Sequence, residues 1–536
     1  MVLIFMDGGE ETGARVRQIA RDVLGLAVLR PAQVEAAEAL AAGRDCLAVL
    51  PSGAGKSAIY QVAGVALGGP VVVVSPLLAL QREQADGLRA RGLSAVTVNG
   101  LSGRAARRDA EALLGSGRTG FIFLGPEQLA RDDVRASLTR AAVRLFAVDE
   151  AHCIASWGHD FRPDYLRLGA VIEAFGARPA VAALTATAAP PVRREIIERL
   201  GLRDPRQVIR DFDRPEIHLA VSAFHRAEDK RQAVLAAVRD QAGSGLVYAA
   251  TRKEAEGYAA LLGVRVYHGG LARGVRLEAQ RAFEGGATIV ATSAFGMGMD
   301  RADVRFVVHA SVPGSLDEYY QEIGRCGRDG QPAAAICCYR AEDLGMLRYF
   351  AAGLPDRGDL VAVAGAVDRP LSRRELGLRT GMPPGRLAEL LNLLEAAGAV
   401  RLRRQVEPAG DAPGPAEAAA RAVELASHHR SVERSRVEMM RRYAEMTDCR
   451  RRFLLRYFGE AVSQACGACD NCDAGQSRPV VATGLFSPGE RVEHHQWGPG
   501  LVLEAEADRL TVLFDEYGYR ELATQVVSGR HLLAPA

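Results

Sequence analysis

Residues 46–74 read CLAVLPSGAGKSAIYQVAGVALGGPVVVV and decide the fold. An apolar run, a glycine-rich turn, a stretch with helical spacing and a second apolar run follow one another, which is the order of a strand, a loop, a helix and a parallel strand. The alternation continues outward with the apolar runs AVTV, FIFL, LFAVDE and AVAALTA, and a second set begins near residue 245 with GLVYAA, VRVYH, TIVAT, RFVVHA and AAICCY. The sequence therefore predicts a parallel α/β architecture that is used twice.

The length and composition are those of a multidomain globular protein. The chain has 536 residues, of which 48% are hydrophobic and 25% are charged, and this predicts roughly three to five domains. The longest apolar stretch, residues 64–80, is interrupted by glycine and proline, so we expect no membrane segment. Residues 1–6 are apolar but carry no preceding basic residue. We therefore expect no export and a cytoplasmic location.

The glycine-rich turn has the chemistry of a phosphate-binding loop. Gly53 and Gly55 allow backbone N–H groups to approach phosphate oxygens, the Lys56 ammonium can reach the β and γ phosphates, and the Ser57 hydroxyl can bind Mg²⁺. The strict pattern has a glycine where Leu50 stands. By itself the loop therefore favours nucleotide binding without establishing it.

An acidic pair after a later apolar run strengthens this interpretation. Asp149 and Glu150 directly follow residues 145–148, at the edge where an open α/β sheet places its ligand chemistry. Asp149 is expected to hold Mg²⁺ through water, and Glu150 to orient and activate the attacking water. The two motifs in this order, about 90 residues apart, predict ATP hydrolysis. A strand-end turn with a capping role is the alternative.

The second repeat contributes two arginines. Residues 321–329 read QEIGRCGRD, which places Arg325 and Arg328 three residues apart. On a helix the two side chains would share one face, and we expect them to stabilise the charge of the γ-phosphate as it is transferred. Solvated surface arginines are the alternative. In the first repeat, Thr185 and Thr187 end an apolar run and are candidates for coupling the nucleotide state to movement, with a polar strand end of no such role as the alternative.

After residue 343 the composition shifts to arginine, leucine and alanine with helical spacing. Residues 372–381, 386–397 and 398–404 resemble a helix, a second helix and the start of a β-wing, which indicates a winged helix. Between Arg369 and Arg456 there are 18 arginines and 11 acidic residues. An anionic partner is expected to bind this region, and a solvated arginine-rich spacer is the alternative.

Four of the nine cysteines lie close together near the C-terminus. Cys449 is followed, after 16 residues, by Cys466, Cys469 and Cys472 at two-residue spacings. Four thiolates complete the tetrahedral coordination of Zn²⁺ and leave no open position, so we expect a structural zinc site. Redox or iron–sulfur chemistry is the alternative, because these spacings also serve iron.

These motifs resemble those of superfamily 2 helicases, and the resemblance narrows after the acidic pair. Residues 153–163 read CIASWGHDFRP, which is similar to the aromatic-rich loop of RecQ DNA helicases. The resemblance covers about residues 15–350 and again 449–473. Its other motifs are LRPAQ at 29–33, VSPL at 74–77, GPE at 125–127, TSAFGMG at 292–298, the segment 321–328, and YFGE at 457–460 between the first two cysteines.

The resemblance implies two RecA-like lobes that clamp ATP between them and step along single-stranded DNA. It implies that Arg30 and Gln33 read the adenine and that Gln321 belongs to the ATP site. Where the family has an aromatic residue near Leu26, this chain is aliphatic, and Arg30 is expected to substitute for the stacking partner.

The resemblance also implies that the aromatic-rich loop couples DNA binding to hydrolysis. Trp157 and Phe161 offer stacking faces to unpaired bases, and His159 and Arg162 can contact phosphate or relay to the acidic pair. Packing of the two rings against the core is the alternative.

The last 50 or so residues return to an alternating pattern, with RVEHH, GLVLEAEA, LTVLFD and YRELA, which predicts a small all-β module. The module resembles the Tudor-like tail of UvrD and PcrA helicases, and such tails bind protein, including RNA polymerase. A plain SH3-like barrel without a ligand is the alternative. The predicted domains are an ATP-binding lobe at 1–205, a second lobe at 206–345, a basic insertion with a winged helix plus a helical hairpin at 346–448, the zinc segment at 449–475, and the Tudor- or SH3-like module at 485–536.

The order of these domains departs from that of the family. In RecQ helicases the zinc segment follows the second lobe closely and a winged helix follows the zinc segment, whereas here about 100 residues precede the first cysteine. We infer that the winged helix has moved into this insertion, which would explain its basic composition.

The resemblance implies an ATP-dependent DNA helicase that moves 3′ to 5′ on single-stranded DNA and unwinds duplex DNA in repair and recombination. The expected cofactors are ATP, Mg²⁺ and Zn²⁺. The expected partners are single-stranded, forked and duplex DNA, and a protein such as RNA polymerase or a repair factor at the C-terminal module. Two alternatives are an ATPase or translocase that remodels protein–DNA complexes without strand separation, and an ATP-switched zinc and winged-helix DNA-binding protein.

Overall fold

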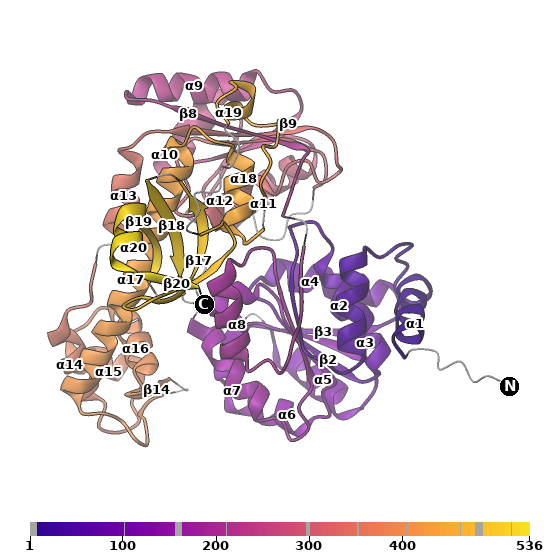
Figure 1. Cartoon of the computed structure of the whole chain (residues 1–536). Coiled ribbons are helices and arrows are strands. Elements are labelled where there is room, and N and C mark those ends of the chain that lie inside the picture. The colour runs from indigo at the N-terminus through magenta and orange to yellow at the C-terminus, as the bar shows by residue number, and fades with distance from the viewer. Residues whose placement is uncertain are drawn as a thin grey trace.

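The computed structural model contains two α/β lobes, a helical insertion and a small β module (Figure 1). Lobe 1, in indigo and magenta, lies at the lower right of Figure 1, and lobe 2 lies above it. The two parallel sheets, the helical insertion and the terminal β module confirm the predicted fold class. The structure describes residues 8–100, 102–155, 163–210, 212–295, 301–350, 353–402, 405–460, 462–477, 486–506, 508–515 and 517–535.

A seven-stranded parallel sheet forms the centre of lobe 1, in the order β3-β4-β2-β5-β6-β1-β7. Its central strands are buried along their whole length, as expected for continuous apolar runs that are covered by helices on both faces. The carboxyl ends of all its strands meet at one edge, where the phosphate loop and the acidic pair follow two of them. The strands are β1 (Cys46–Val49), β2 (Pro70–Val74), β3 (Ser94–Val98), β4 (Gly120–Leu124), β5 (Leu145–Val148), β6 (Ala180–Thr185) and β7 (Arg206–Ile209). The helices are α1 (Gly8–Asp22), α2 (Pro31–Ala41), α3 (Lys56–Leu67), α4 (Leu78–Ala90), α5 (Arg104–Gly115), α6 (Asp132–Arg140), α7 (Leu168–Glu173) and α8 (Pro190–Leu200), with short 3₁₀ turns η1 (Pro126–Ala130), η2 (Ala151–Ile154) and η3 (Pro163–Arg167).

Lobe 2 repeats this plan with a six-stranded parallel sheet in the order β10-β11-β9-β12-β13-β8. All five runs predicted for this lobe form strands, and β8 is an additional edge strand. The strands are β8 (Ile217–Ala223), β9 (Ser244–Tyr248), β10 (Arg265–Tyr267), β11 (Ile289–Ala291), β12 (Val304–His309) and β13 (Ala333–Tyr339). The helices are α9 (Ala227–Arg239), α10 (Arg252–Leu262), α11 (Arg273–Glu284), α12 (Leu316–Ile323) and α13 (Asp343–Phe350).

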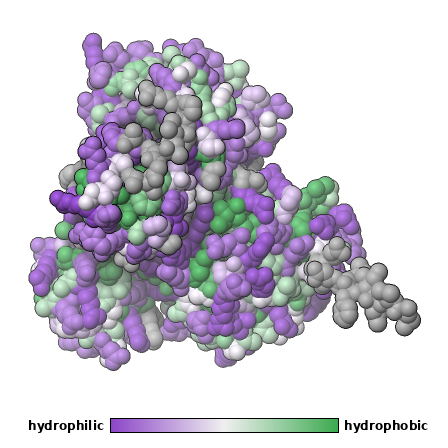
Figure 2. Space-filling view, viewed as in Figure 1, coloured by the Kyte–Doolittle hydropathy of each residue, from purple (hydrophilic) through white to green (hydrophobic). Residues whose placement is uncertain are grey.

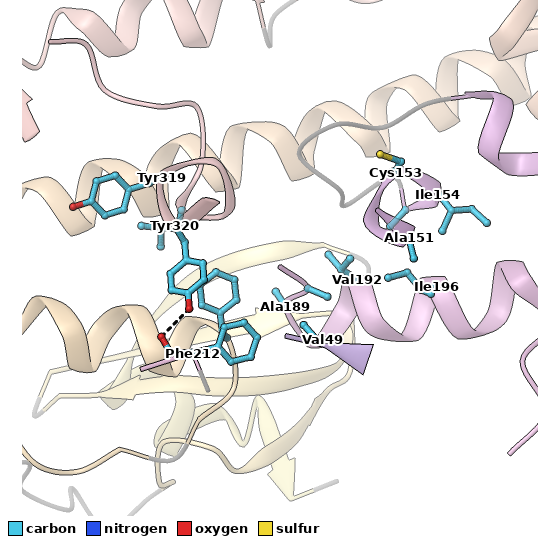
Figure 3. Close-up of a cluster of buried hydrophobic side chains, with 14 of the residues drawn as sticks. Val49, Ala151, Cys153, Ile154, Ala189, Val192, Ile196, Phe212, Tyr319 and Tyr320 are labelled. Carbon is cyan, nitrogen blue, oxygen red and sulfur yellow. Dashed lines mark hydrogen bonds between the residues drawn. The ribbon is translucent and has the colours of Figure 1, made fainter. Parts of the chain in front are cut away.

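The connection between the lobes lies between Ile209, where β7 ends, and Ile217, where β8 begins. Strand β7 pairs with β1 of lobe 1 and β8 pairs with β13 of lobe 2, so the predicted boundary after residue 205 separates β7 from its own sheet. Figure 3 shows Phe212 of this connection beside Tyr320 of α12, and the Tyr320 hydroxyl donates to the Phe212 carbonyl at 2.8 Å. The same apolar cluster continues to Val192 and Ile196 of α8. The connection is therefore packed between the lobes.

The helical insertion has its own apolar core. The two predicted helices and the β-wing are present, because α15 and α16 are followed by an antiparallel hairpin of β14 and β15. The predicted helical hairpin is wrong: α17 runs for 31 residues as one helix, and no glycine or proline interrupts residues 416–445. The elements are α14 (Arg357–Ala366), α15 (Arg373–Thr380), α16 (Pro384–Ala396), β14 (Val400–Leu402), β15 (Val406–Pro408) and α17 (Pro415–Glu445).

The C-terminal module is a five-stranded antiparallel sheet in the order β19-β18-β17-β16-β20. This confirms the predicted all-β module, while α20 was not predicted and the likeness to a Tudor-like tail stays a prediction. The zinc segment before it carries α18 (Arg450–Tyr457) and α19 (Asp470–Asp473). The module contains β16 (Arg491–His494), β17 (Gly498–Ala505), β18 (Arg509–Phe514), β19 (Gly518–Ala523), α20 (Thr524–Arg530) and β20 (Leu533–Pro535).

The visible face of the molecule is mostly hydrophilic, with hydrophobic residues in small patches (Figure 2). Within the described residues, none of the helices combines the length and the apolar composition that a bilayer-spanning segment requires.

Candidate nucleotide site and cysteine centre

The phosphate loop has the conformation that its glycines were expected to provide. Gly53 and Gly55 have φ angles of 78° and 70°, a left-handed region that residues with a Cβ rarely adopt, and α3 begins at Lys56. Leu50 is not among the residues with positive φ, and its carbonyl accepts a hydrogen bond from Lys56 Nζ at 3.1 Å. The departure from glycine at Leu50 therefore leaves the loop intact.

One ammonium and two carboxylates lie around the loop. Burial lowers the pKa of Lys56, and the negative charges of Glu150 and Asp149 partly oppose this effect. Ser57 lies in the first turn of α3, directly after Lys56. The predicted phosphate and metal ligands of lobe 1 therefore lie together at the carboxyl edge of its sheet.

Gln33 contacts the phosphate loop directly. Its Nε2 donates to the carbonyls of Ala54 and Gly55, both at 2.9 Å, and its Oε1 accepts from the backbone N–H of Arg30 at 2.8 Å. A Cβ on Gly55 would lie 2.5 Å from Gln33 Nε2, so this contact also requires glycine. The structure thus ties α2 to the loop through Gln33, and reading of the adenine by Arg30 and Gln33 stays a prediction.

Asp149 is held by two hydroxyl groups at the end of β5. Its Oδ2 accepts from Ser75 Oγ at 3.2 Å, and its carbonyl accepts from the Tyr165 hydroxyl at 2.9 Å. Burial raises the pKa of Asp149 to about 7, with a further contribution from Glu150, while Lys56 lowers it. Ionising this carboxyl costs free energy in the resting protein, and a bound divalent cation would strongly stabilise its charged form.

Glu150 has an unusual backbone for a residue with a side chain. Its φ is 48°, in the left-handed region, which costs on the order of 1–3 kcal/mol and is typical of functional sites. Its Oε2 is buried and accepts no hydrogen bond from the described residues, although His152 Nδ1 lies 3.4 Å away. This oxygen is therefore placed to accept from a water molecule.

His152 joins the acidic pair to the threonines at the end of β6. Thr185 Oγ1 donates to the carbonyl of Thr187 at 3.0 Å, so it must accept from His152 Nδ1–H across the 2.8 Å that separate the two atoms. His152 therefore lies between Glu150 and the two threonines, with its Nδ1 3.4 Å from Glu150 Oε2. Its role in coupling nucleotide state to movement stays a prediction.

Arg325 and Arg328 do not share a helix face, and this part of the prediction is wrong. Helix α12 ends at Ile323, and both arginines lie in the turns that follow. The helix stops because Gly324 and Gly327 follow, and Gly327 has a φ of 66°. Arg328 Nε donates to the Gly324 carbonyl at 3.2 Å.

Arg328 nevertheless reaches the nucleotide site of lobe 1. A Cβ on Gly53 would lie 3.2 Å from Arg328 Cδ, and the positive charge of Arg328 contributes to the lowered pKa of Lys56. The two lobes therefore meet at the phosphate loop. Gln321 occupies the last turn of α12, and its place in the ATP site stays a prediction.

The predicted DNA-contact residues lie outside the part of the chain that the structure describes. These are Trp157, His159, Phe161 and Arg162. The segments on either side are described: η2 continues directly from Glu150, and η3 begins at Pro163. Both flanking turns lie close to the acidic pair, because η2 follows Glu150 in sequence and the Tyr165 hydroxyl of η3 donates to the Asp149 carbonyl.

The four cysteines form the predicted cluster. The thiol sulfurs of Cys449, Cys466, Cys469 and Cys472 all lie within 4.8 Å of one another, and Cys466 Sγ is 3.9 Å from Cys472 Sγ. Tetrahedral Zn–S bonds of about 2.3 Å place sulfurs about 3.8 Å apart. The Cys449 sulfur also accepts from the backbone N–H groups of Arg452 and Cys466 at 3.4 and 3.2 Å. The donor set therefore fits one zinc ion with no open position.

Several residues at the site were not predicted. Arg214 donates to the carbonyls of Gly324 and Cys326 at 3.4 and 3.0 Å and thereby fixes the turn that carries both arginines. The sequence could have pointed to Ser75, because this residue directly follows β2, the neighbour of β5 in the sheet. The sequence contains no such signal for Arg214, which lies in a proline-containing connection far from the turn in sequence.

Comparisons with known proteins agree with this site. Residues 30–195 match the DEAD/DEAH box helicase family, residues 229–330 match the helicase conserved C-terminal domain, and residues 400–473 match the RecQ zinc-binding family. The ATP-dependent DNA helicase RecQ of Synechocystis sp. is 33% identical over 497 residues, which cover 86% of this chain and 98% of that relative. This chain belongs to the RecQ family.

The coverage of other RecQ proteins is less complete. The ATP-dependent DNA helicase RecQ of Pasteurella multocida is 31% identical over 469 residues, which cover 85% of this RecQ-family chain but 62% of the relative. The helicase Lhr of Mycobacterium smegmatis, solved with single-stranded DNA and AMP-PNP, has the same fold, with a TM-score of 0.50 and 19% identity over 80% of this chain and 62% of that chain.

Proposed function

We propose that this RecQ-family chain is an ATP-dependent DNA helicase that moves 3′ to 5′ along single-stranded DNA and unwinds duplex DNA in repair and recombination. One observation carries the proposal: Arg328 of lobe 2 lies against Gly53 of the phosphate loop in lobe 1. A nucleotide at this junction would contact both lobes, so its binding and hydrolysis would alternately favour and disfavour their closure. Membership of the RecQ family supports DNA as the track.

Lobe 1 supplies the residues that we propose bind ATP and Mg²⁺. Backbone N–H groups at Gly53 and Gly55 and the Lys56 ammonium hold the phosphates, and Ser57 and Asp149 hold the cation. When bound, Mg²⁺ would neutralise charge on the β and γ phosphates. The phosphate-binding residues and the cation-binding residues both lie at the carboxyl edge of the lobe 1 sheet.

Glu150 and the two arginines are proposed to act on the transferred phosphate. Glu150 Oε2, buried and accepting no described hydrogen bond, orients the attacking water and accepts its proton. Arg325 and Arg328 place guanidinium charge where negative charge spreads on the γ-phosphate. The proposed ATP site is completed by three residues that bind the rest of the nucleotide, Arg30, Gln33 and Gln321.

The loop at residues 156–162 is proposed to contact single-stranded DNA through Trp157, His159, Phe161 and Arg162, by base stacking and phosphate contacts. Its position between η2 and η3 supports coupling to hydrolysis.

The insertion is anchored to the segment that follows this loop. Arg167 of η3 donates to Glu395 Oε2 at 3.1 Å and to the Leu402 carbonyl at 3.2 Å. If the insertion is a DNA-binding winged helix, these contacts would place it beside the DNA loop of lobe 1. The duplex ahead of the single strand would then meet the insertion.

A direct test compares ATP turnover with single-stranded DNA, duplex DNA and RNA, together with strand separation of a forked duplex that has a 3′ tail. We expect single-stranded DNA to stimulate turnover more than RNA, and the fork to be unwound only with ATP. Glu150→Gln serves as the control, because it should retain nucleotide binding but support neither activity. Equal stimulation by RNA, or no stimulation at all, would contradict the proposal.

A second candidate function is a translocase that remodels protein–DNA complexes without strand separation. The position of the insertion favours it, because the insertion precedes the zinc segment and is fastened to lobe 1 through Arg167. DNA-stimulated turnover without unwinding of any fork would select this alternative. If the affinity for DNA changes with the bound nucleotide but ATP is not turned over repeatedly, the chain would instead be an ATP-switched DNA-binding protein.

The C-terminal module is proposed to bind a protein, such as RNA polymerase or a repair factor. Part of its surface already contacts other parts of this chain. Arg442 of α17 pairs with Glu504 and Glu521, and Arg194 of α8 pairs with Asp515. A partner would therefore have to use the remaining surface of the module. A cytoplasmic location, where such partners and DNA occur, is part of the same proposal.

A further inference from the structure

Arg193, in the first turn of α8, connects lobe 1 to the zinc segment. Its Nε donates to the Ala188 carbonyl at 2.8 Å, and its Nη2 donates to the Phe458 carbonyl at the end of α18. Ala188 directly follows Thr187, the second threonine of the pair at the end of β6. One guanidinium therefore joins the main chain beside this pair to the main chain of the zinc segment.

The two main-chain segments approach each other closely around this arginine. Gly459 has a φ of 85°, and a Cβ at this position would lie 3.2 Å from Pro190 Cγ at the start of α8. The Arg193 guanidinium also lies over the Phe212 ring, 5.9 Å from its centroid, and this ring stacks on Phe458. The arginine therefore contacts both the connection between the lobes and the end of α18.

The zinc segment is itself attached to lobe 2. Arg451 donates to the Ile217 carbonyl at 2.5 Å, and Asp470 Oδ2 accepts from the Val221 backbone N–H at 2.8 Å. Ile217 and Val221 both belong to β8, the edge strand of the lobe 2 sheet. A change in the angle between the lobes would therefore move the end of α18 relative to α8.

We propose that Arg193 is a positioning residue that couples the arrangement of the two lobes to hydrolysis. Its guanidinium passes a displacement of the zinc segment to the main chain that follows Thr187. His152 Nδ1 lies 2.8 Å from Thr185 Oγ1 and 3.4 Å from Glu150 Oε2, which places the threonine pair next to the acidic pair. Because both of the acceptors described for Arg193 are main-chain carbonyls, the arginine acts through the residues that it positions. This inference rests on the proposed stimulation of ATP hydrolysis by single-stranded DNA.

The test measures kcat and KM for ATP with and without saturating single-stranded DNA, together with the melting temperature, for variants of the full chain. Arg193→Ala removes both hydrogen bonds. It is expected to lower the ratio of the DNA-stimulated kcat to the basal kcat about tenfold, with the basal kcat and KM within about twofold of the parent. Arg193→Lys should fall between the parent and Arg193→Ala, because one ammonium cannot occupy the positions of both Nε and Nη2.

Arg135→Ala is the matched control. Arg135 is a half-buried arginine of α6 in the same lobe, and it also donates to a main-chain carbonyl, that of Leu129, at 2.8 Å. The variant should lose a similar amount of thermal stability and keep the parent ratio of the two kcat values. An arginine that only stabilises its own helix would behave in the same way.

The outcomes separate the two proposals. If single-stranded DNA does not raise the kcat of the parent, the proposed function fails and the inference fails with it. If DNA stimulates the parent but Arg193→Ala has the same ratio as Arg135→Ala, only the role of Arg193 is overturned. An equal fall in the basal and the stimulated kcat would also overturn it, because Arg193 would then act on hydrolysis itself and not on its coupling to DNA. If Arg193→Ala does not fold, the same comparisons with Arg193→Lys decide the question.

Discussion

The side chain of Arg328, from lobe 2, lies against Gly53 of the phosphate loop in lobe 1. A Cβ on Gly53 would lie 3.2 Å from Arg328 Cδ and 3.4 Å from Cγ. The loop therefore has room for the arginine because residue 53 has no side chain. Gly53 also has a φ of 78°, so the same position serves both the loop conformation and the contact between lobes.

Gly53→Ala should lower ATP turnover by more than backbone strain alone would. The left-handed conformation costs a residue with a Cβ roughly 1–2 kcal/mol, and the added methyl group also pushes Arg328 away from the phosphates. We expect a small fall in melting temperature and a fall in kcat of about tenfold or more, because the arginine acts in the transition state. Steady-state kinetics and thermal melts of the same preparations measure both effects.

Gly92→Ala is the matched control, because Gly92 has a φ of 77° and a Cβ at this position would have no described atom within 4 Å. It should show a similar loss of stability with normal turnover. Equal kcat in the two variants would mean that the contact between Arg328 and Gly53 does not matter for hydrolysis.

Arg328→Ala should bind ATP nearly as well as the parent and turn it over about a thousandfold more slowly, as expected for an arginine that stabilises the transition state. Arg328→Lys should recover little of this loss, because a lysine offers a single point charge in place of a planar fork. Nucleotide binding by fluorescence and turnover under saturating DNA provide the two measurements. An ATP affinity that falls as much as kcat would show instead that Arg328 contributes uniform binding.

The strands and the chemistry of lobe 1 were predictable because both are local in sequence. Apolar runs define β1, β2 and β5, and the residues directly after a parallel strand must lie at its carboxyl edge. Strand β7 was missed because only one of its four residues is buried, so it carries no apolar run to recognise. Edge strands of this kind are identified by pairing, which the sequence does not display.

The place of Arg328 beside the phosphate loop was predicted, but the shared helix face of Arg325 and Arg328 was not right, and the place of Arg325 at the nucleotide stays a prediction. Helix α12 ends at Ile323, and Arg214 fixes the turn beyond it from the connection between the lobes. Contacts between residues about 110 positions apart depend on how the two lobes pack. Periodicity within one segment holds no information about them.

Asp149→Asn should stabilise the nucleotide-free protein at pH 8 while abolishing hydrolysis. The pKa of Asp149 rises from 3.8 to about 7 on folding, chiefly through burial, so the folded state holds a proton that the unfolded state has lost. Stability contributed by this group therefore falls as pH rises from about 4 to 7 and stays low above 7. Asparagine carries no charge, so its advantage in melting temperature should be present at pH 8 and small at pH 5.

Asp45→Asn is the control for this pH dependence. Asp45 is buried and pairs with Arg178 at 2.8 Å, so its neutral variant leaves the half-buried guanidinium without its carboxylate and should be less stable at both pH values. A melting temperature of Asp149→Asn below that of the parent at pH 8 would show that the Asp149 carboxylate is well solvated in the resting protein.

The cysteine centre should have a structural role. Loss of its metal should disturb the contact between the lobes, because α18 connects the two. Phe458, at the end of α18, stacks on Phe212 of the connection with 4.7 Å between centroids, and Cys449 caps the start of this helix. Cys449→Ser should therefore reduce bound zinc, lower the yield of soluble protein, and weaken stimulation by single-stranded DNA in the protein that remains, because metal binding is coupled to local folding. Metal analysis should give one zinc per parent chain and much less in the variant.

Ser477→Ala provides the comparison for Cys449→Ser. Ser477 Oγ lies 3.1 Å from Cys472 Sγ but is not one of the four thiolates, so this variant should keep its zinc and its DNA-stimulated turnover. Cys472→Ser should fall between the two, because Cys472 is partly exposed and caps no helix, whereas Cys449 is buried. A brown iron–sulfur chromophore in anaerobically purified protein, or full zinc content in Cys449→Ser, would contradict a four-thiolate zinc site at these residues.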